Sequence, residues 1–438
     1  MIFRKFAVNF AVLFFALFTM FLLSGPINTF ADEKQEYYEM IVPEPKDPKP
    51  GELIMAAEWR IWIPESVKTL RGVVVHQHGC GEGSCNSGRT GAYDLHWQAL
   101  ARKYDCALIA VSYRQNKHRC EMWCDPRNGS AQSFLNALDY FAKKSGHPEL
   151  TVVPWALWGH SGGGHWCGSM VQLYPKRVMA AWLRSGHPDC VGRIYDSLPM
   201  NSDVLQVPIM LNLGAKETDM HSVFDGGREY FQKIRSEGAK IGLMIDPNTH
   251  HETGNSRYPA IRFLDLCMEQ RIPAVPGSAD LRPMKTECVL PADAIGNKDH
   301  EKYLQKGIWL PTADFADVWK KYSKDNTFDD STPPAAPFEV MLDQSGHMHW
   351  KCRADLESGL QTFEIRCDGK KIADLPTQKS VHGRPLFQGM SYSDSPDPSL
   401  PKMEYQIANY KSGEKHVYSI GAKNTAGLLS PFINAEIK

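Results

Sequence analysis

Short apolar runs alternate with longer amphipathic stretches along the first two thirds of the chain. Such a run, bounded by glycine or polar residues, is typical of a strand that is buried on both faces of a parallel sheet. Regular alternation of these strands with helix-length stretches predicts an α/β domain. The predicted strands are RGVVVH from Arg71, ALIAVS from Ala107, WALWG from Trp155, VMAAWL from Val178, PIMLNLG from Pro208 and IGLMID from Ile241.

Two of the longer stretches carry helix signals. Residues 130–144 place apolar side chains at helical spacing, with Ser130 available to cap the start and Gly146 to end the helix. A second helix is predicted over residues 258–270, after the last of the strands. Strands and helices therefore follow one another as a mostly parallel sheet with flanking helices requires.

The pattern changes near residue 330. The segment DDSTPPAAP, Asp329 to Pro337, is rich in proline and lacks apolar periodicity, which is typical of a stiff linker. Beyond it, HMHWKCRA, QTFEIRCD and HVYSIGAKN alternate apolar with polar residues, as half-buried strands do. The last part of the chain is thus predicted to be a β-sandwich of about a hundred residues.

The predicted sandwich resembles a fibronectin type III domain over residues 337–438, with residues 377–404 as an enlarged loop. We expect four parts along the chain: a signal peptide (1–31), a main α/β domain (32–276), an extension and linker (277–336) and the sandwich (337–438). The resemblance rests on Trp350 in an early strand and on the late residues Tyr418, Ile420, Ala422, Asn424, Gly427 and Ser430.

The first thirty residues have the pattern of an export signal. Arg4 and Lys5 precede an apolar stretch over residues 6–23, and a small residue, Ala31, ends the segment at a plausible cleavage point. We expect cleavage after Ala31, a secreted or periplasmic protein, and no membrane partner after cleavage. The apolar stretch is nearly long enough to span a bilayer, so an uncleaved anchor is the alternative.

Charge and cysteine content narrow the class of protein. Lys and Arg number 49 against 50 Asp and Glu, so no excess charge favours nucleic acid or an acidic surface as partner, and the oligomeric state stays open. Eleven cysteines in an exported chain indicate disulfides. We expect Cys106 to be a buried free thiol. The expected pairs are Cys120–Cys124, Cys267–Cys288 and Cys352–Cys367.

The stretch WGHSGGGHW, residues 158–166, contains the strongest chemical signal. The strand WALWG ends at Gly159 and apolar residues resume at Trp166, so Ser161 lies where a strand turns directly into a helix. This is the context of a nucleophile elbow, in which glycines allow a tight turn and the serine oxygen is exposed. A glycine-rich helix cap is the alternative interpretation.

A serine hydroxyl needs a base to accept its proton and an acid to orient that base. Glu217, in AKETDM after PIMLNLG, is the expected acid, with Asp219 as the alternative. His251, in PNTHHETG after IGLMID, is the expected base, with His250 as the alternative. The order serine, acid, histidine is that of α/β-hydrolases.

The turn HGCG after the first predicted strand is the expected source of an oxyanion hole. The backbone amides of Cys80 and Gly162 are the expected donors to the developing negative charge. His76 and His78, on one face of that strand, raise the possibility of a metal. Because no carboxylate or cysteine shows metal-like spacing with them, we expect no metal at these histidines.

Clues to the substrate are few. Four side chains near predicted strand ends are candidates to line a cleft, and aromatic faces suit sugars or phenolic acyl groups. Core packing is the alternative for the two tryptophans, and pairing with a carboxylate is the alternative for the arginine. The candidates are Trp123, Trp166, Arg114 and His187.

The strand, the HGCG turn, the elbow GHSGG, Glu217 and His251 together resemble secreted α/β-hydrolase esterases over about residues 50–275. The similar families are polyhydroxyalkanoate depolymerases, feruloyl esterases and acetylxylan esterases. The resemblance implies hydrolysis of carboxylic esters, on an acylated polysaccharide or a related ester, without a cofactor. The chain departs from these families in its glutamate acid and in residues 277–326. A serine peptidase of the same fold and a non-catalytic adhesion protein are the alternatives.

Overall fold

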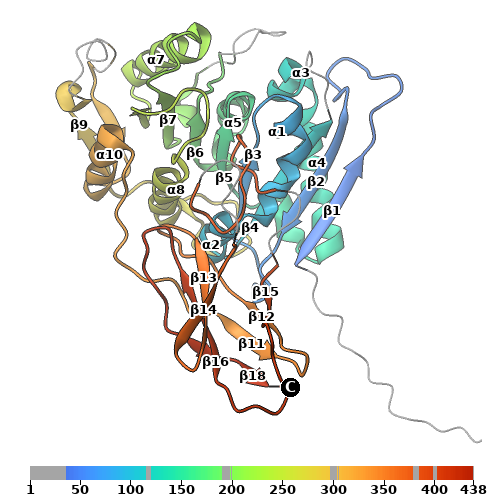
Figure 1. The fold of residues 1–438 in the computed structure, drawn as a ribbon. Helices are drawn as coiled ribbons and strands as arrows, with labels where there is room; N and C mark the ends of the chain where they lie inside the picture. The colour runs from blue at the N-terminus through green and yellow to red at the C-terminus, as the bar shows by residue number, and fades with distance from the viewer. Residues whose placement is uncertain are drawn as a thin grey trace, which may run out of the picture. The chain divides into compact units, whose positions relative to one another are not determined.

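The six apolar runs that predict strands all form strands of one sheet (Figure 1). Every residue in them is buried except Arg114 at the end of the second strand. Burial on both faces is what a parallel sheet between two layers of helices requires. The strands are β3 (Gly72–Gln77), β4 (Cys106–Arg114), β5 (Trp155–His160), β6 (Val178–Arg184), β7 (Ile209–Gly214) and β8 (Ile241–Asp246).

Two strands that the apolar pattern did not predict extend this sheet at one edge. They are β1 (Tyr37–Val42) and β2 (Ala56–Trp62). β1 alternates half-buried with exposed residues, so it has no continuous apolar run to mark it. The strand order is β1-β2-β4-β3-β5-β6-β7-β8, with β1 and β2 antiparallel to their neighbours and the rest parallel. This eight-stranded, mostly parallel sheet agrees with the predicted α/β class.

The computed structural model describes residues 36–114, 120–189, 198, 200–295, 303, 305–377, 384–397 and 402–437. Residues 36–438 form a single compact unit. The predicted signal peptide lies outside the described residues. Within the described part of the chain, no helix combines the length and the apolar character needed to cross a bilayer.

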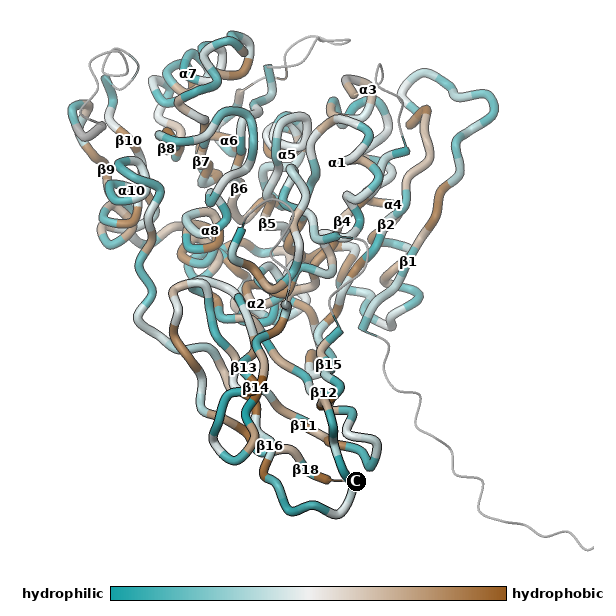
Figure 2. Tube along the Cα trace, in the orientation of Figure 1, coloured by the Kyte–Doolittle hydropathy of each residue, from teal (hydrophilic) through white to brown (hydrophobic). Residues whose placement is uncertain are grey.

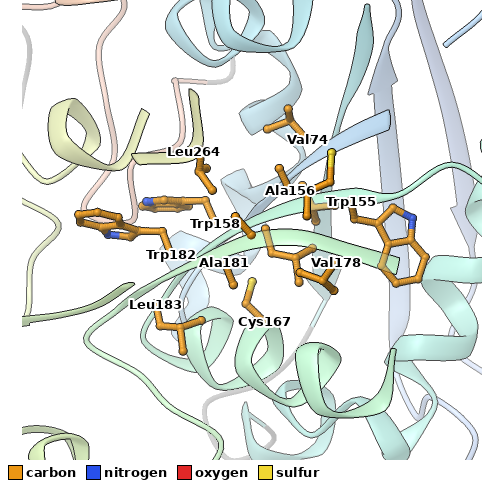
Figure 3. Close-up of a cluster of buried hydrophobic side chains, with 14 of the residues drawn as sticks. Val74, Trp155, Ala156, Trp158, Cys167, Val178, Ala181, Trp182, Leu183 and Leu264 are labelled. Carbon is orange, nitrogen blue, oxygen red and sulfur yellow. The ribbon is translucent and has the colours of Figure 1, made fainter. Parts of the chain in front are cut away.

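Helices cover both faces of the sheet. α5 (Gly162–Leu173) packs on β3, β5 and β6, whereas α8 (Arg257–Arg271) packs on β5 and β6. Figure 3 shows Cys167 of α5 and Leu264 of α8 on opposite sides of these strands. The other helices are α1 (Glu82–Ser87), α2 (Leu95–Lys103), α3 (Cys120–Cys124), α4 (Ser130–Ser145), α6 (Ser202–Leu205) and α7 (His221–Ser236), with short 3₁₀ turns at η1 (Gly88–Tyr93), η2 (Pro126–Asn128), η3 (Pro148–Thr151) and η4 (Pro175–Arg177).

Both predicted helices are present, as α4 and α8. The capping prediction for α4 is half right. Gly146 ends the helix in the left-handed region, with φ 76°, as expected. Gly129, with φ 89°, is the residue that precedes the helix, and the Ser130 hydroxyl donates to the Trp123 carbonyl instead of capping.

The extension after α8 packs against the far edge of the sheet. Its strands β9 (Cys288–Leu290) and β10 (Ile308–Leu310) pair antiparallel, and α10 (Ala313–Asp325) packs on β8 and α8. Trp319 is buried and donates from Nε1 to the Leu243 carbonyl at 2.8 Å. The extension therefore shares the hydrophobic core of the α/β part. A short 3₁₀ turn, η5 (Ala292–Ile295), lies between β9 and β10.

The C-terminal region is all β, as the alternating pattern predicts. Two four-stranded sheets, β15-β12-β11-β18 and β14-β13-β16-β17, enclose a second core around Trp350 and Phe363. Figure 2 shows hydrophobic residues concentrated along strands and hydrophilic ones along the connecting loops. The fibronectin type III assignment itself remains a prediction. The strands are β11 (Phe338–Leu342), β12 (His347–Lys351), β13 (Thr362–Cys367), β14 (Lys370–Leu375), β15 (Glu404–Gln406), β16 (Tyr418–Lys423), β17 (Ile433–Asn434) and β18 (Glu436–Ile437).

The expected disulfide pairs are wrong. Cys80 pairs with Cys120, with 5.5 Å between their Cα atoms. Cys120 and Cys124 lie four positions apart on α3, and side chains at that helical spacing have Cβ atoms about 5–6 Å apart, beyond the reach of a disulfide. Cys106 is a buried free thiol, as predicted. Cys267, Cys288, Cys352 and Cys367 are free thiols, so the other two expected pairs do not form.

Candidate active site

Ser161 lies on a sharp turn between β5 and α5. Its backbone has φ 56° and ψ −120°, a strained conformation for a residue with a side chain. A Cβ on Gly163 would lie 2.4 Å from the His78 carbonyl oxygen, and one on Gly186 would lie 2.0 Å from that of Ser161. The turn therefore depends on glycine at both positions, and it lifts the serine to the carboxyl edge of the sheet.

The structure brings Ser161, His251 and Glu217 together as a hydrogen-bonded triad. Ser161 Oγ lies 2.8 Å from His251 Nε2, and His251 Nδ1 lies 2.7 Å from Glu217 Oε1. These residues follow β5, β8 and β7, so one edge of the parallel sheet gathers them. The arrangement can pass a proton from the serine hydroxyl to the imidazole while the carboxylate holds the ring.

The two alternative residues form a different pair. His250 Nε2 lies 2.9 Å from Asp219 Oδ1, and both side chains are exposed. The alternative acid and base therefore pair with each other at the surface, whereas Glu217 is buried against His251.

The environment of Glu217 keeps its carboxylate ionised. Full burial raises its pKa, but the hydrogen bond to His251 and the nearby charge of Arg184 outweigh burial, so the net pKa is lowered. Its second oxygen, Oε2, accepts from the Gly214 amide at 2.8 Å. A fixed negative charge at Nδ1 favours the tautomer that leaves Nε2 free to accept a proton.

Arg184 and His160 support the triad, and the sequence analysis missed both. Buried Arg184, at the end of β6, donates to Thr249 Oγ1 at 2.9 Å and to the carbonyls of His250 and Glu252, so it holds the loop that carries the imidazole. His160 Nε2 donates to the His251 carbonyl at 2.6 Å. Burial lowers the His160 pKa well below its usual value, so the ring stays neutral. The sequence signal for Arg184 is a charged residue at the end of an apolar run whose strand has no exposed residue.

The residues predicted to form an oxyanion hole lie side by side. Gly162 is the first residue of α5, and a Cβ on it would lie 2.3 Å from Cys80 Sγ. The same position is 3.1 Å from Cys120 Sγ, so the disulfide lies against the start of the helix. It thereby ties the turn after β3 to α3, next to Ser161.

The four candidate cleft residues are engaged elsewhere. Trp123 and Trp166 are fully buried, and Trp166 Nε1 donates to Ser130 Oγ at 3.0 Å, so both have the packing role. His187 is buried, stacks on Tyr230 and lies 2.9 Å from the Ser222 carbonyl. Arg114 pairs with both carboxylate oxygens of Glu58 at 2.7 Å, the alternative considered from the sequence.

The histidines weighed as metal ligands are packed in the core. His76 stacks on Trp158 with ring centroids 4.4 Å apart, and burial lowers its pKa to about 3. Burial likewise lowers the pKa of His78 to about 4. Among the described residues, the group of three potential metal ligands that comes together is Cys367, Asp368 and His416, on the C-terminal sheets. It includes neither core histidine.

The mostly parallel eight-stranded sheet, the helices on both its faces and the triad at its carboxyl edge fit the α/β-hydrolase architecture. No protein-family model and no curated protein matches the chain. Solved structures with some similarity include a ferulic acid esterase, which is 13% identical with a TM-score of 0.38 and is aligned over 53% of this chain and 98% of its own.

Two further solved structures are similar at the same level. Poly(aspartic acid) hydrolase-1 from Sphingomonas sp. KT-1 is 16% identical with a TM-score of 0.36, over 52% of this chain and 98% of that one. Dienelactone hydrolase from Anabaena variabilis ATCC 29413 is 16% identical with a TM-score of 0.35, over 55% and 100%. Identities and scores this low carry no argument about activity, so the chemistry is argued from the site itself.

Proposed function

We propose that the protein is an exported serine esterase that hydrolyses carboxylic esters through an acyl-enzyme. The observation that carries the proposal is the unbroken chain of hydrogen bonds from Ser161 through His251 to Glu217, at 2.8 and 2.7 Å. These are hydrogen-bond distances at which a general base can take the proton of a nucleophile. The strained turn at Ser161 adds support, because strain of this kind is typical of nucleophile elbows.

In the proposed mechanism, His251 accepts the proton of Ser161 as its Oγ attacks the ester carbonyl. The amides of Cys80 and Gly162 stabilise the oxyanion that forms. His251 then protonates the leaving alcohol, and an acyl group remains on Ser161. The imidazole next takes a proton from water, which attacks the acyl-enzyme and releases the acid. Throughout, Glu217 holds the ring orientation and stabilises its positive charge.

Acylated polysaccharide or a related ester is the proposed substrate class, on the strength of the sequence resemblance. We also propose the four-part division of the chain, with the fibronectin type III-like sandwich following the linker. Substrate selection needs groups beyond the triad, because the triad acts only on the ester carbonyl.

The first prediction tests the nucleophile. Ser161→Ala should lower kcat by roughly four to six orders of magnitude, because the oxygen that forms the acyl-enzyme is lost. The measurement is hydrolysis of p-nitrophenyl acetate, methyl ferulate, acetylated xylan and a peptide amide by the mature protein and the variant. Undiminished ester hydrolysis by Ser161→Ala would contradict the assignment, and faster cleavage of the amide than of the esters would favour a peptidase.

A further inference from the structure

A segment of the C-terminal region reaches the carboxyl edge of the large sheet. It comprises residues 384–397, between β14 and β15, and we call it the inserted segment. In Figure 1 the orange-red chain rises from the C-terminal sheets among the blue and green elements of the α/β part. The inserted segment forms hydrogen bonds with His160, with the Gly79 amide in the turn after β3 and with Thr253 in the loop that carries His251.

Ser393 joins the inserted segment to the triad. Its hydroxyl lies 3.2 Å from His160 Nδ1, accepts from the Gly79 amide at 3.4 Å and lies 2.6 Å from Ser84 Oγ. Because His160 Nε2 donates to the His251 carbonyl, its Nδ1 is the acceptor and the Ser393 hydroxyl is the donor. A chain of hydrogen bonds thus runs from the C-terminal region to the backbone of the catalytic histidine.

Buried charges anchor the inserted segment. Asp394 accepts from Arg257 at 2.8 Å and also pairs with Arg384, while Arg257 pairs with Asp94 at 2.6 Å. Asp94, Arg257 and Asp394 are buried, and the side chain of Arg384 is 9% exposed. Asp94 and Arg257 come from the α/β part, Arg384 and Asp394 come from the inserted segment, and the ion pair between Arg257 and Asp394 joins the two. The position of the segment is therefore fixed by charge as well as by packing.

The side chain of Tyr392, also in the inserted segment, is open to solvent. Its neighbours Ser393 and Asp394 are buried, yet Tyr392 remains 42% exposed. The centroid of its ring lies 5.5 Å from that of His160, which lies 5.2 Å from that of His251. Its carbonyl accepts from Thr253 Oγ1 at 3.3 Å, which fixes its backbone. An aromatic ring is thus held at the rim of the triad with part of its surface free.

We propose that the inserted segment forms one wall of the active site and that Tyr392 is a substrate-binding residue, whose ring packs against a ring in the acyl or alcohol part of the ester. This inference rests on the proposed esterase function. Sugar rings and aromatic acyl groups both present a face to an aromatic side chain, so the shared chemistry is a ring close to the ester bond. Partial burial raises the pKa of Tyr392 to about 12, so its hydroxyl stays protonated and can donate a hydrogen bond.

The second prediction tests this wall with esters that differ in their rings. Methyl ferulate carries an aromatic acyl group, an acetylated xylo-oligosaccharide carries sugar rings, and ethyl butyrate carries none. Tyr392→Ala should lower kcat/KM for at least one ring-bearing ester about tenfold relative to ethyl butyrate, the loss expected for one aromatic contact. The ester that is affected identifies the ring. Tyr392→Phe should restore most of the selectivity.

Phe338→Ala is the matched control, because Phe338 is an exposed aromatic residue on β11. It should leave the ratio between the esters as in the unchanged protein. An equal loss on all three esters in Tyr392→Ala, or no change in any ratio, would overturn the proposal.

Binding to Ser161→Ala separates this inference from the proposed function. Calorimetry with ferulate and xylotriose measures recognition without turnover, and adding Tyr392→Ala should weaken the binding of one of them about tenfold. Equal binding with and without Tyr392 would overturn the inference even if esters are hydrolysed. Absence of ester hydrolysis by the unchanged protein would overturn the proposed function, while this binding measurement would still decide the role of Tyr392.

Discussion

At the scale of single residues, burial distinguishes Glu217 from Asp219 as the acid of the proposed triad. Glu217 and Asp219 are two positions apart in the loop after β7, yet only Glu217 is buried against His251. Asp219 pairs with His250 in solvent. An exposed ion pair contributes little to structure or charge balance, whereas a buried carboxylate beside an imidazole sets the tautomer of the ring.

The third prediction follows from this difference. Glu217→Gln keeps the size of the side chain but removes its charge, so the imidazolium formed in the reaction is no longer stabilised. We expect kcat for p-nitrophenyl acetate to fall by roughly two to four orders of magnitude. Asp219→Asn is the matched control and should stay within about threefold of the unchanged protein, since the surface pair has a small energy. Equal losses in both variants would exclude Glu217 as the specific acid.

The candidate triad could be predicted from the sequence because its residues lie after apolar strands. Ser161 directly follows β5, and Glu217 and His251 lie in the loops after β7 and β8, so the topology of a parallel sheet brings all three to one edge. Tyr392 has no such marker, because it lies in an irregular segment more than two hundred positions after Ser161. Its role depends on long-range packing that no local pattern contains.

At the scale of elements, the disulfide between Cys80 and Cys120 links the turn after β3 to α3. The turn carries one of the proposed oxyanion amides, and an oxyanion hole works only when its donors are fixed before the reaction. The expected pair Cys120–Cys124 would have stabilised α3 alone. The observed pair instead connects two elements that flank the start of α5.

The fourth prediction is that Cys120→Ser lowers kcat for p-nitrophenyl acetate about tenfold, less than full loss of a donor because the amide remains and only its position is freed. The measurement is steady-state kinetics of the oxidised protein and the variant. Cys367→Ser, which removes a free thiol on β13, is the matched control and should keep the original kcat. Identical kinetics for the two variants would show that the disulfide does not position the turn.

Local pattern predicted the six buried strands, as apolar runs, and the helices α4 and α8, but it did not predict α7, which is as long as α4. It did not predict β1, whose residues are half exposed, or the packing of α10 on β8. The proline-rich segment that follows α10 separates the two hydrophobic cores in sequence, but the inserted segment brings them back into contact. A local sequence pattern does not predict such long-range contacts, because they join residues that are far apart in the sequence.

At the scale of the whole molecule, the buried cluster of Asp94, Arg257, Arg384 and Asp394 joins the two halves. The ion pair between Arg257 and Asp394 crosses from the α/β part to the inserted segment. Trp97 adds a longer contact from Nε1 to Asp394 at 3.4 Å. Loss of one carboxylate leaves guanidinium groups in the interior without full compensation, which costs much more than loss of an exposed pair.

The fifth prediction is that Asp394→Ala lowers the free energy of unfolding by roughly 3–5 kcal/mol, as measured by urea denaturation. Asp374→Ala removes an exposed partner of Lys371 on β14 and is the matched control, with an expected change within about 0.5 kcal/mol. A loss of stability in Asp394→Ala no larger than in this control would show that the cluster does not hold the halves together.

The position of the inserted segment has a consequence for truncation of the protein. Ending the chain at the proline-rich stretch would delete Ser393 and Asp394 together with the C-terminal β-sheets. His160 would then lose the Ser393 hydroxyl, and Arg257 would keep Asp94 but lose Asp394. Removing only the loop would keep the sheets but strip the rim beside the nucleophile. The C-terminal sheets and the candidate active site would therefore have to be redesigned together.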